Sequence, residues 1–556
     1  MLPILEVTEK QIPASTSSPR LLTFGPVYYP IVYVRGYAMT PGEREEVFHD
    51  GYYGFAATSV EKRQAPTPPG NPEAASGSNR QVADIFEGQL IRFMKLGDYR
   101  YLDAVNEGLR EAAHPERSIW VSRFYDQDFI SGQGRSIEDH ARELADLILV
   151  DIPARLRAAT GNPHDPLTGY KVILIAHSMG GLVSRCLLQN ILPLERQLAP
   201  TAWVHRLVTM GTPHRGIDLG RVPDFLEQAI VQALNPFGSD IFQEKRMREY
   251  LNLGQETAAS LANEDKDGKK DYTYDVHSLG ESRFPASQCL CLIGSDYASY
   301  GAVRNVTGAY SDGLVRQDRA YLVAGPRPGP GGYAHADRAF TANVHRAHSG
   351  YRGIVNSYES FENIQRFLFG DVRVDIALGG LRVHTPVPDN STKVFYDFEF
   401  KLSVRGSNAY LHQRGQIPCE NAIRLDRHAL NPNTELKLHT AFLNSKLARL
   451  NDPALHFLLA FRVVEFRVRD GFLFDTSYPE RTIYSESVEM RVTGANEAEV
   501  PTLVEYHWLS DANAPDGDWA AVPNTGTDTN ALAAYDFDLR ASGSLAGQVR
   551  LRAAAW

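Results

Sequence analysis

Cysteine is scarce in this chain, with four residues among 556. The four are Cys186, Cys289, Cys291 and Cys419, and they have neither metal-ligand spacing nor the number that a disulfide framework needs. Cys289 and Cys291 lie two apart in an apolar segment, so we expect them to share one face of a strand and to pack as small hydrophobic side chains. The sequence therefore predicts no metal site and no disulfide scaffold.

Long apolar runs are also missing. No run approaches the roughly 20 apolar residues that span a bilayer as a helix. Residues 1–20 have a short apolar patch but lack the basic start and the sustained apolar core of a secretory signal. We therefore expect a cytoplasmic protein without a transmembrane segment, although export by a route that leaves no such mark stays open.

The chain has no long basic run to offset its formal net charge of -10, which argues against a nucleic-acid partner. Hydrophobic residues make up 43% of the chain and charged residues 22%, which is the mix of a soluble globular protein. A length of 556 residues exceeds what one compact core accommodates. The composition thus predicts two or more globular domains.

The pattern of expected elements changes near residue 370. Before it, apolar segments suited to strands buried on both faces alternate with helical stretches. These apolar segments are 28–37, 118–126, 171–177, 203–216 and 289–296. The long helical stretch 136–160 begins with "SIED", the pattern of a capping box. This alternation predicts that residues 1–371 form an α/β domain with a doubly wound, mainly parallel sheet.

Two stretches interrupt the alternation. Residues 60–80 are rich in Pro, Gly, Ser and Ala and are typical of a surface loop. Residues 217–287 are a long insertion in which segment 222–234 has apolar residues near one helical face. We expect this insertion to form a cap, although an ordinary packed helix would show the same pattern.

The last part of the chain reads differently. A helix that ends at Asp371 closes the α/β region, and polar and apolar residues then alternate without a comparable helix. The Asp470-Gly471 pair is a hairpin signal. Residues 372–556 are therefore predicted to form an all-β sandwich domain, in which we find no convincing catalytic constellation.

The segment "KVILIAHSMGGLVSRCLL" places Ser178 between an apolar strand and a helix with one apolar face. The five-residue pattern around Ser178, with a small residue first, Ser third and Gly fifth, is common by chance. The interpretation therefore depends on the strand before it and the helix after it. A strand that reverses into a helix strains the backbone of the turn residue and needs small neighbours, here Ala176, Gly180 and Gly181. The turn aims the first helical amides at an anion formed above the sheet. We therefore predict that Ser178 is a nucleophile rather than an ordinary turn serine.

A nucleophilic serine needs an acid and a histidine, which follow it in that order in such a fold. Asp312 lies in a tight turn with Gly313 ahead of an apolar segment, where it is well placed to orient an imidazole. Asp296, at the end of an expected strand, is the rival acid. We favour Asp312 and keep Asp296 as the alternative.

The histidine is expected in a loop just before the last helix of the α/β region. His345 and His348 both lie there, and His335 lies further upstream. We favour His348, which lies closer to that helix, and expect His345 to form a hydrogen bond within the loop. His177 and His214 are expected to be packed neighbours rather than bases.

Several of these segments resemble the lipase and esterase branch of the α/β-hydrolase family. They are "VRGYA", "AHSMGG", "MGTPHRG", "SDGLV" and the late "HSG" ahead of "RFLFG", and they span roughly residues 28–370. The resemblance implies a serine hydrolase that acts on carboxylic esters without an organic cofactor. It also assigns the oxyanion hole to the amides of Tyr37 and Met179, with Arg35 where the family usually has histidine. Some relatives bind calcium through an acid two residues after the histidine, but Gly350 stands there, so no such site is implied.

We therefore predict a lipase-like or esterase-like serine hydrolase that works through Ser178, His348 and Asp312 and an acyl-enzyme. Its substrate is expected to be a small-molecule or lipid ester. The alternatives are a phospholipase or acyltransferase with the same triad, and an inactive hydrolase scaffold that acts as a binding protein. We expect the β-sandwich to serve positioning, through a lipid surface, a partner or the hydrolase domain itself. The sequence does not indicate the oligomeric state.

Overall fold

The computed structural model describes residues 22–25, 28–36, 61–64, 81–84, 87–96, 99–101, 114–122, 135–217, 241–254, 272–282, 284–299, 310–328, 333, 337–350, 352–386, 392–404, 409–416, 418–433, 435–444, 454–469, 476–477, 480–495, 501–510, 519–527 and 533–556. Tyr37, His335, segment 222–234 and the Asp470-Gly471 pair lie outside them. Within the described ranges, no helix is long and apolar enough to cross a membrane.

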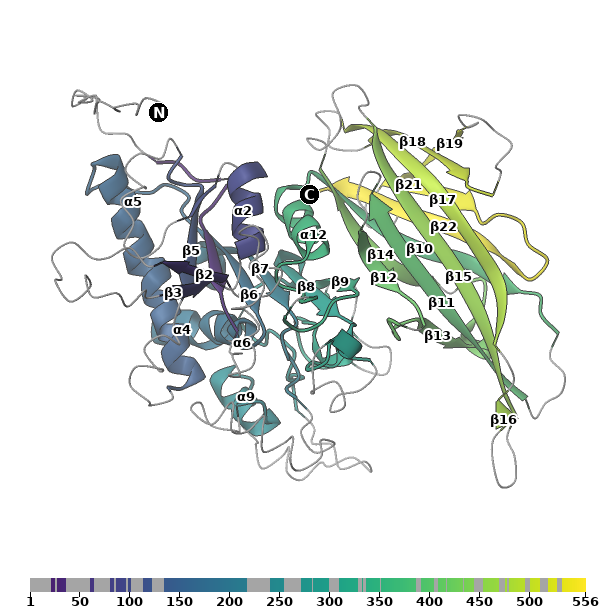
Figure 1. The fold of residues 1–556 in the computed structure, drawn as a ribbon, viewed down its shortest axis with the longest axis horizontal. Coiled ribbons are helices and arrows are strands. Elements are labelled where there is room, and N and C mark those ends of the chain that lie inside the picture. The colour runs from purple at the N-terminus through teal and green to yellow at the C-terminus, as the bar shows by residue number, and fades with distance from the viewer. Residues whose placement is uncertain are drawn as a thin grey trace, which may run out of the picture.

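A seven-stranded sheet forms the centre of the first part of the chain (Figure 1). In spatial order its strands are β4 (Arg100–Tyr101), β5 (Ser118–Ser122), β1 (Ile31–Val34), β6 (Val172–His177), β7 (Val204–Met210), β8 (Cys289–Gly294) and β9 (Phe340–Val344). Every neighbouring pair runs parallel. Strands β1, β6 and β8 are buried along their whole length, which explains their continuous apolar sequences. The predicted parallel sheet is confirmed.

Helices flank the sheet in two separate groups. The described α-helices are α2 (Glu87–Leu96), α4 (Ile137–Asp146), α5 (Ile152–Thr160), α6 (Met179–Cys186), α7 (Pro200–Trp203), α9 (Glu244–Tyr250) and α12 (Tyr358–Phe369). Helix α4 packs against α6. Helix α2 packs against α12, where the ring centroids of Phe93 and Phe361 are 4.9 Å apart (Figure 1).

The predicted capping box at Ser136 is present. The Ser136 hydroxyl oxygen accepts the Asp139 backbone N–H at 3.2 Å, and the Asp139 carboxylate accepts the Ser136 backbone N–H at 3.1 Å. A π-helical turn over Leu147–Asp151 joins α4 to α5. The predicted helix over 136–160 is therefore continuous but not α-helical throughout.

Three elements differ from the sequence-based expectation. Strand β9 was not expected, because polar Thr341 and Asn343 break the apolar pattern of this edge strand. Strand β2 (Glu61–Gln64) pairs antiparallel with β3 (Gln81–Asp84), so the stretch expected to be a loop begins as a strand. Helix α12 ends at Phe369 rather than at Asp371.

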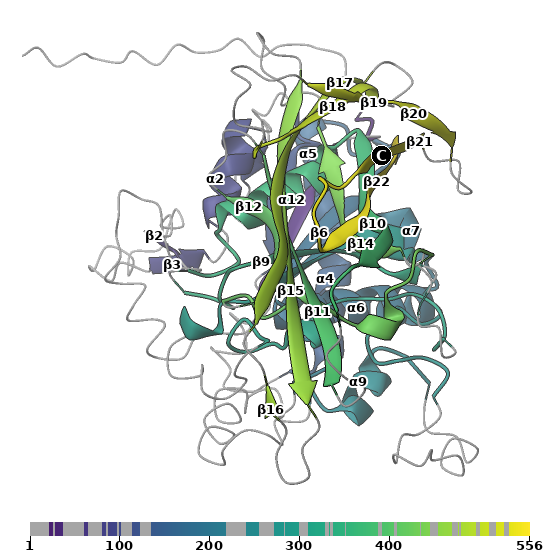
Figure 2. The same ribbon diagram turned by 90° about the vertical axis from the view of Figure 1, so that its right-hand side faces the viewer.

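Two antiparallel sheets follow α12 and face each other (Figures 1 and 2). One contains β14 (Leu436–Leu443), β10 (Val372–Val383), β22 (Leu545–Ala555), β21 (Ala533–Asp538) and β20 (Asn524–Thr527). The other contains β12 (Tyr410–Arg414), β11 (Thr392–Val404), β15 (Leu455–Arg469), β17 (Arg481–Ala495), β18 (Pro501–Trp508) and β19 (Ala520–Val522), with β13 (Ile423–Asp426) and β16 (Thr476–Ser477) paired at its side. Both sheets contribute buried residues to one core, including Leu378 and Val549 from the first and Phe398 and Phe461 from the second. The predicted β-sandwich is confirmed.

Aromatic packing joins the sandwich to the α/β region. The Trp556 ring centroid lies 4.7 Å from that of Phe442 on β14, 5.5 Å from that of Phe367 on α12 and 5.4 Å from that of Phe340 on β9. The Trp556 indole N–H donates to the Phe367 carbonyl at 2.7 Å. The end of the chain therefore lies beside α12, where Figure 1 marks it.

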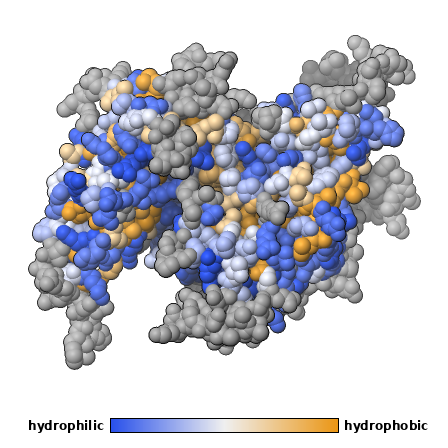
Figure 3. Space-filling view, turned by 180° about the vertical axis from the view of Figure 1, so that it is seen from behind, coloured by the Kyte–Doolittle hydropathy of each residue, from blue (hydrophilic) through white to orange (hydrophobic). Residues whose placement is uncertain are grey.

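The described surface is mostly hydrophilic on the face shown in Figure 3, with smaller hydrophobic patches between the polar residues. This distribution is ordinary for a folded protein surface, to which apolar atoms always contribute. The hydrophobic side chains of the long strands are accordingly found in the two cores rather than in one broad exposed patch.

Candidate active site

Ser178 occupies a strained turn between β6 and α6. Its backbone has φ 53° and ψ -128°, a conformation that residues other than glycine rarely adopt. Three hydrogen bonds hold it: the Ser178 N–H donates to the Met210 carbonyl at 2.9 Å, and the Ser178 carbonyl accepts the Thr212 hydroxyl at 2.9 Å and the Gly181 N–H at 3.0 Å. The surroundings therefore fix the turn that presents the Ser178 hydroxyl.

Small residues allow the backbone segments around Ser178 to approach closely. A Cβ atom on Gly180 would lie 2.3 Å from the Val34 carbonyl oxygen of β1. A Cβ atom on Gly36 would lie 2.5 Å from the Ser178 Cβ, and one on Gly181 would lie 2.2 Å from the Thr212 hydroxyl oxygen. Only glycine fits at these three positions without movement of the neighbours.

Asp312 follows β8 in a loop that holds its carboxylate by backbone hydrogen bonds. The N–H groups of Leu314 and Val315 donate to Asp312 Oδ1 at 3.0 and 2.7 Å. The other oxygen, Oδ2, lies 2.9 Å from His348 Nδ1. Asp296, the rival acid, instead accepts the Ser299 N–H at 3.1 Å. The structure thus brings Asp312 to His348.

His348 lies in the loop after β9 and is fully buried. Its Nε2 atom lies 2.9 Å from Ser178 Oγ, and its backbone N–H donates to the Asp312 carbonyl at 2.8 Å. The imidazole therefore contacts Ser178 on one side and Asp312 on the other. Its position is determined by the main chain as well as by the side chains.

The other histidines near the serine have separate partners. His345 Nδ1 lies 3.3 Å from the Ser295 hydroxyl oxygen. His177 Nε2 lies 3.0 Å from the His348 carbonyl oxygen, and burial holds the pKa of His177 well below its usual value. His214 Nε2 lies 3.0 Å from the Thr209 hydroxyl oxygen, and burial likewise lowers the pKa of His214. His177 and His214 are therefore neutral packed residues, as expected.

Gly211, at the end of β7, was not singled out from the sequence. Its backbone has φ 55°, and a Cβ atom there would lie 2.9 Å from Asp312 Oδ2 and 3.1 Å from His348 Nδ1. A side chain at this position would therefore press on the Asp312–His348 pair. The first glycine of "MGTPHRG", directly after an expected strand, is the sequence signal that could have identified it.

Arg185, on α6, is a second residue that the sequence did not reveal. It is fully buried, and its guanidinium donates to the carbonyls of His214, Val276 and Ser278 at 3.0, 2.8 and 2.7 Å. Its Nε donates to the Gln189 side chain at 2.9 Å. These bonds tie the helix that follows Ser178 to two loops, a long-range role that no local pattern indicates.

The two proposed oxyanion donors differ in what can be described. Met179 is the first residue of α6, where backbone N–H groups have no partner within the helix. Its amide therefore belongs to the helix N-terminus next to Ser178, a position that suits an anion. Tyr37 lies outside the described residues. Gly36, the residue before it, is the last residue of the described range 28–36 and lies next to Ser178.

Among the described residues, no group of three or more His, Cys, Asp or Glu side chains is arranged to hold a metal ion. All four cysteines are buried free thiols. Burial raises the pKa of Cys186, Cys289, Cys291 and Cys419. They are therefore poor nucleophiles compared with a low-pKa reactive cysteine.

Comparison with known proteins bears on the fold. Residues 76–236, less than a third of the chain, match the PGAP1-like alpha/beta domain. No curated protein matches the chain. Among solved structures, Bacillus licheniformis lipase BlEst2 in mature form is 14% identical over 62% of this chain and 93% of its own, with a TM-score of 0.27. Phospholipase PlaB from Legionella pneumophila is 13% identical over 82% of this chain and 91% of its own, with a TM-score of 0.30.

The matched domain contains Ser178, β6 and β7, and the parallel sheet with its flanking helices has the α/β-hydrolase arrangement. The chain therefore has an α/β-hydrolase core followed by a β-sandwich.

The fit of α6 against β1 predicts a large effect of one added methyl group. Gly180→Ala should lower the thermal unfolding temperature of the full chain, because the new Cβ would overlap a backbone carbonyl that cannot rotate away. We expect a net destabilisation of about 2 kcal/mol, in which the overlap exceeds the gain of about 1 kcal/mol in helix propensity. Differential scanning calorimetry measures the change.

Gly543→Ala is the matched control, because a Cβ atom there meets nothing within 4 Å and the backbone needs no positive φ. It should leave the unfolding temperature near that of the wild type. Equal unfolding temperatures for Gly180→Ala and Gly543→Ala would contradict the close packing described for this turn.

Proposed function

We propose that this protein is a serine carboxylic-ester hydrolase in which Ser178 is the nucleophile, His348 the base and Asp312 the acid. One observation carries the proposal: Ser178 Oγ, His348 Nε2, His348 Nδ1 and Asp312 Oδ2 form an unbroken series of contacts, with both separations at 2.9 Å. A serine hydroxyl is a weak nucleophile at neutral pH and needs such a base, itself oriented by a third group. The contacts favour catalysis over an inactive scaffold.

The chemistry follows from these positions. As Ser178 Oγ attacks the ester carbonyl carbon, its proton moves to His348 Nε2. Asp312 accepts the Nδ1–H of His348, which selects the required tautomer and stabilises the imidazolium. The imidazolium then protonates the departing alcohol, and an acyl group remains on Ser178. Water attacks this acyl-enzyme, gives its proton to His348, and the carboxylic acid leaves as Ser178 recovers its proton.

The negative charge that develops on the carbonyl oxygen needs hydrogen-bond donors. The Met179 amide at the start of α6 supplies one, and we assign the second to the Tyr37 amide. Donors of this kind each contribute about 10²–10³ in rate in comparable enzymes. No cofactor or metal takes part in this scheme.

Lipid-like or other acyl esters are the proposed substrate class. The insertion over residues 217–287 is proposed to cap an apolar acyl pocket, and its described parts are 217, 241–254 with α9, 272–282 and 284–287. A phospholipase or an acyltransferase would use the same three side chains. A phospholipase would attack a phospholipid ester, and an acyltransferase would pass the acyl group to an alcohol instead of water. The protein is proposed to act in the cytoplasm on a small-molecule or lipid ester.

The division of labour between the two parts of the chain is also a proposal. We assign catalysis to residues 1–371 and positioning to residues 372–556, through contact with a lipid surface, a partner or the hydrolase domain. The contacts of Trp556 with α12 and β9 support the last of these. The oligomeric state is left open.

The assignment of His348 predicts unequal effects at two neighbouring histidines. His348→Ala should reduce the turnover of p-nitrophenyl butyrate about 10⁴-fold or more, because the members of a triad act as a unit. His345→Ala is the matched control and should cost less than about tenfold, because His345 contacts Ser295 rather than Ser178. Circular dichroism of both variants checks folding. Near-normal turnover of folded His348→Ala, beside loss in His345→Ala, would reverse the assignment.

The substrate class is tested with p-nitrophenyl esters of increasing acyl length. We expect hydrolysis to extend to medium and long acyl chains, because a capped apolar pocket gains binding free energy with each buried methylene group. Ser178→Ala, with the same fold, should lose this activity at every chain length. Hydrolysis of acetate alone would reject the apolar pocket, whereas equal activity of wild type and Ser178→Ala would reject the serine mechanism.

A further inference from the structure

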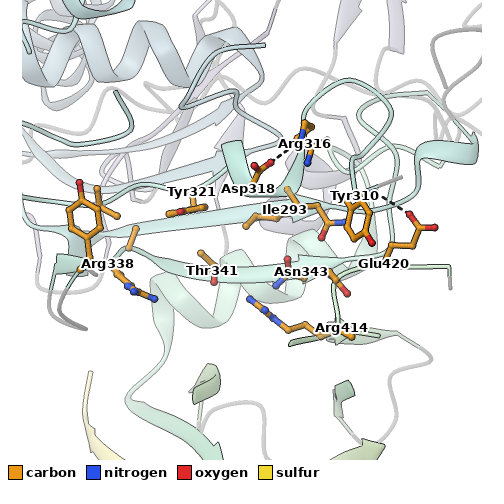
Figure 4. Close-up of a pocket in the computed structure, with 16 residues that line it drawn as sticks. Ile293, Tyr310, Arg316, Asp318, Tyr321, Arg338, Thr341, Asn343, Arg414 and Glu420 are labelled. Carbon is orange, nitrogen blue, oxygen red and sulfur yellow. Dashed lines mark hydrogen bonds and ion pairs between the residues drawn. The ribbon is translucent and has the colours of Figure 1, made fainter. Parts of the chain in front are cut away.

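A cleft lies between the α/β sheet and the sandwich, away from Ser178. It consists of two adjoining cavities of about 520 and 350 Å³, one of which Figure 4 shows. The two cavities share Tyr333, Arg338, Ala339, Thr341 and Arg414 in their walls. We call it the β9–β12 cleft, because β9 carries Thr341 and β12 ends at Arg414. None of the three proposed catalytic side chains lines it.

Basic side chains outnumber carboxylates in the walls of the β9–β12 cleft. Arg338 and Arg414 line both cavities, Arg316 lines the first and Lys437 lines the second. Arg316 is paired with Asp318 at 3.2 Å, and Lys437 lies 3.3 Å from Asp375. The cleft therefore carries a positive charge that its own acids do not balance.

Arg338 and Arg414 have no carboxylate within ion-pair distance among the described residues. The nearby acid in the first cavity, Glu420, accepts the Tyr310 backbone N–H at 3.2 Å, as the dashed line in Figure 4 shows. Burial lowers the pKa of Arg414 to about 10 and the pKa of Lys437 to about 7, because their charges lose solvent without full compensation. Burial of these two basic groups therefore costs solvation free energy that the described residues do not fully offset.

Two buried hydrogen-bond donors in the first cavity also have no partner. They are Arg414 Nε and Asn343 Nδ2, and both side chains line this cavity (Figure 4). Both groups can only donate, so an acceptor would satisfy them. Buried polar groups are normally hydrogen-bonded, so these two donors call for an acceptor, which a bound water or anion would supply.

We propose that the β9–β12 cleft binds a phosphate-bearing anion, with Arg414 and Arg338 contacting the phosphate and Asn343 donating a further hydrogen bond. A guanidinium presents paired N–H groups whose geometry matches phosphate oxygens. Lys437 lies in the adjoining cavity, where a bound anion would favour its charged form. Tyr321 and Tyr333 give the walls aromatic surface against which an organic part of the ligand packs.

The phosphate could come from a soluble metabolite or from a lipid headgroup, so the experiment has two arms. In the first, inorganic pyrophosphate is titrated into the full-length protein by isothermal titration calorimetry at matched ionic strength. In the second, the protein is sedimented with phosphatidylcholine vesicles that contain or lack phosphatidic acid. We expect saturable binding in at least one arm, weakened about tenfold or more in Arg414→Gln.

Arg382→Gln is the matched control, because Arg382 is exposed on β10 and lines neither cavity. It should bind as the wild type does. Arg338 is exposed at the same cleft, and Arg338→Gln should also weaken binding. This variant replaces Arg414→Gln in the test if Arg414→Gln does not fold. Dependence on Arg414 or Arg338 in the pyrophosphate arm identifies a soluble ligand, and the same dependence only with phosphatidic acid identifies a headgroup.

Absence of binding in both arms, or binding that these arginines do not affect, would overturn the proposal. The test measures binding alone and needs no catalytic activity. Its outcome is therefore separate from that of the proposed ester hydrolysis.

Discussion

The strained backbone of Ser178 is the constraint on which the rest of the site depends. Holding a residue other than glycine at φ 53° is unfavourable, so the neighbours must over-determine the turn. The Ser178 N–H donates to the Met210 carbonyl and the Ser178 carbonyl accepts the Thr212 hydroxyl, while the absence of side chains at Gly36 and Gly180 lets the neighbouring backbone approach. The same turn directs the Ser178 hydroxyl out of the sheet and sets the N-terminus of α6 beside it.

The parallel sheet supplies the partners of Ser178. Loops that follow β8 and β9 emerge at the same edge as the turn after β6, so Asp312 and His348 reach Ser178 from strands distant in sequence. Glycine again makes room: a Cβ atom on Gly294 would lie 2.7 Å from the Asp312 Cβ, and one on Gly211 would lie against the Asp312–His348 pair. The geometry of the site therefore depends on the close approach of backbone segments at these glycines as well as on the three side chains.

Much of the core could be predicted from the sequence, because β1, β6 and β8 are buried on both faces and read as apolar runs. Chain order and turn chemistry made Asp312 and His348 the favoured candidates. In the structure, His348 contacts Asp312 through Nδ1 and Ser178 through Nε2. Strand β9 escaped prediction because polar Thr341 and Asn343 interrupt its apolar pattern. Arg185 and the Trp556 contacts depend on residues far apart in the chain, which no local pattern reveals.

We propose above all that the environment of Ser178 makes its hydroxyl a nucleophile. Reaction of the full chain with a fluorophosphonate, followed by peptide mass spectrometry, tests it most directly, because the probe traps an activated serine whatever the natural ester is. The account predicts one adduct, on the peptide that contains Ser178, and none in a folded Ser178→Ala variant. A folded wild-type protein that stays unlabelled, or that carries the adduct on another serine, would contradict it.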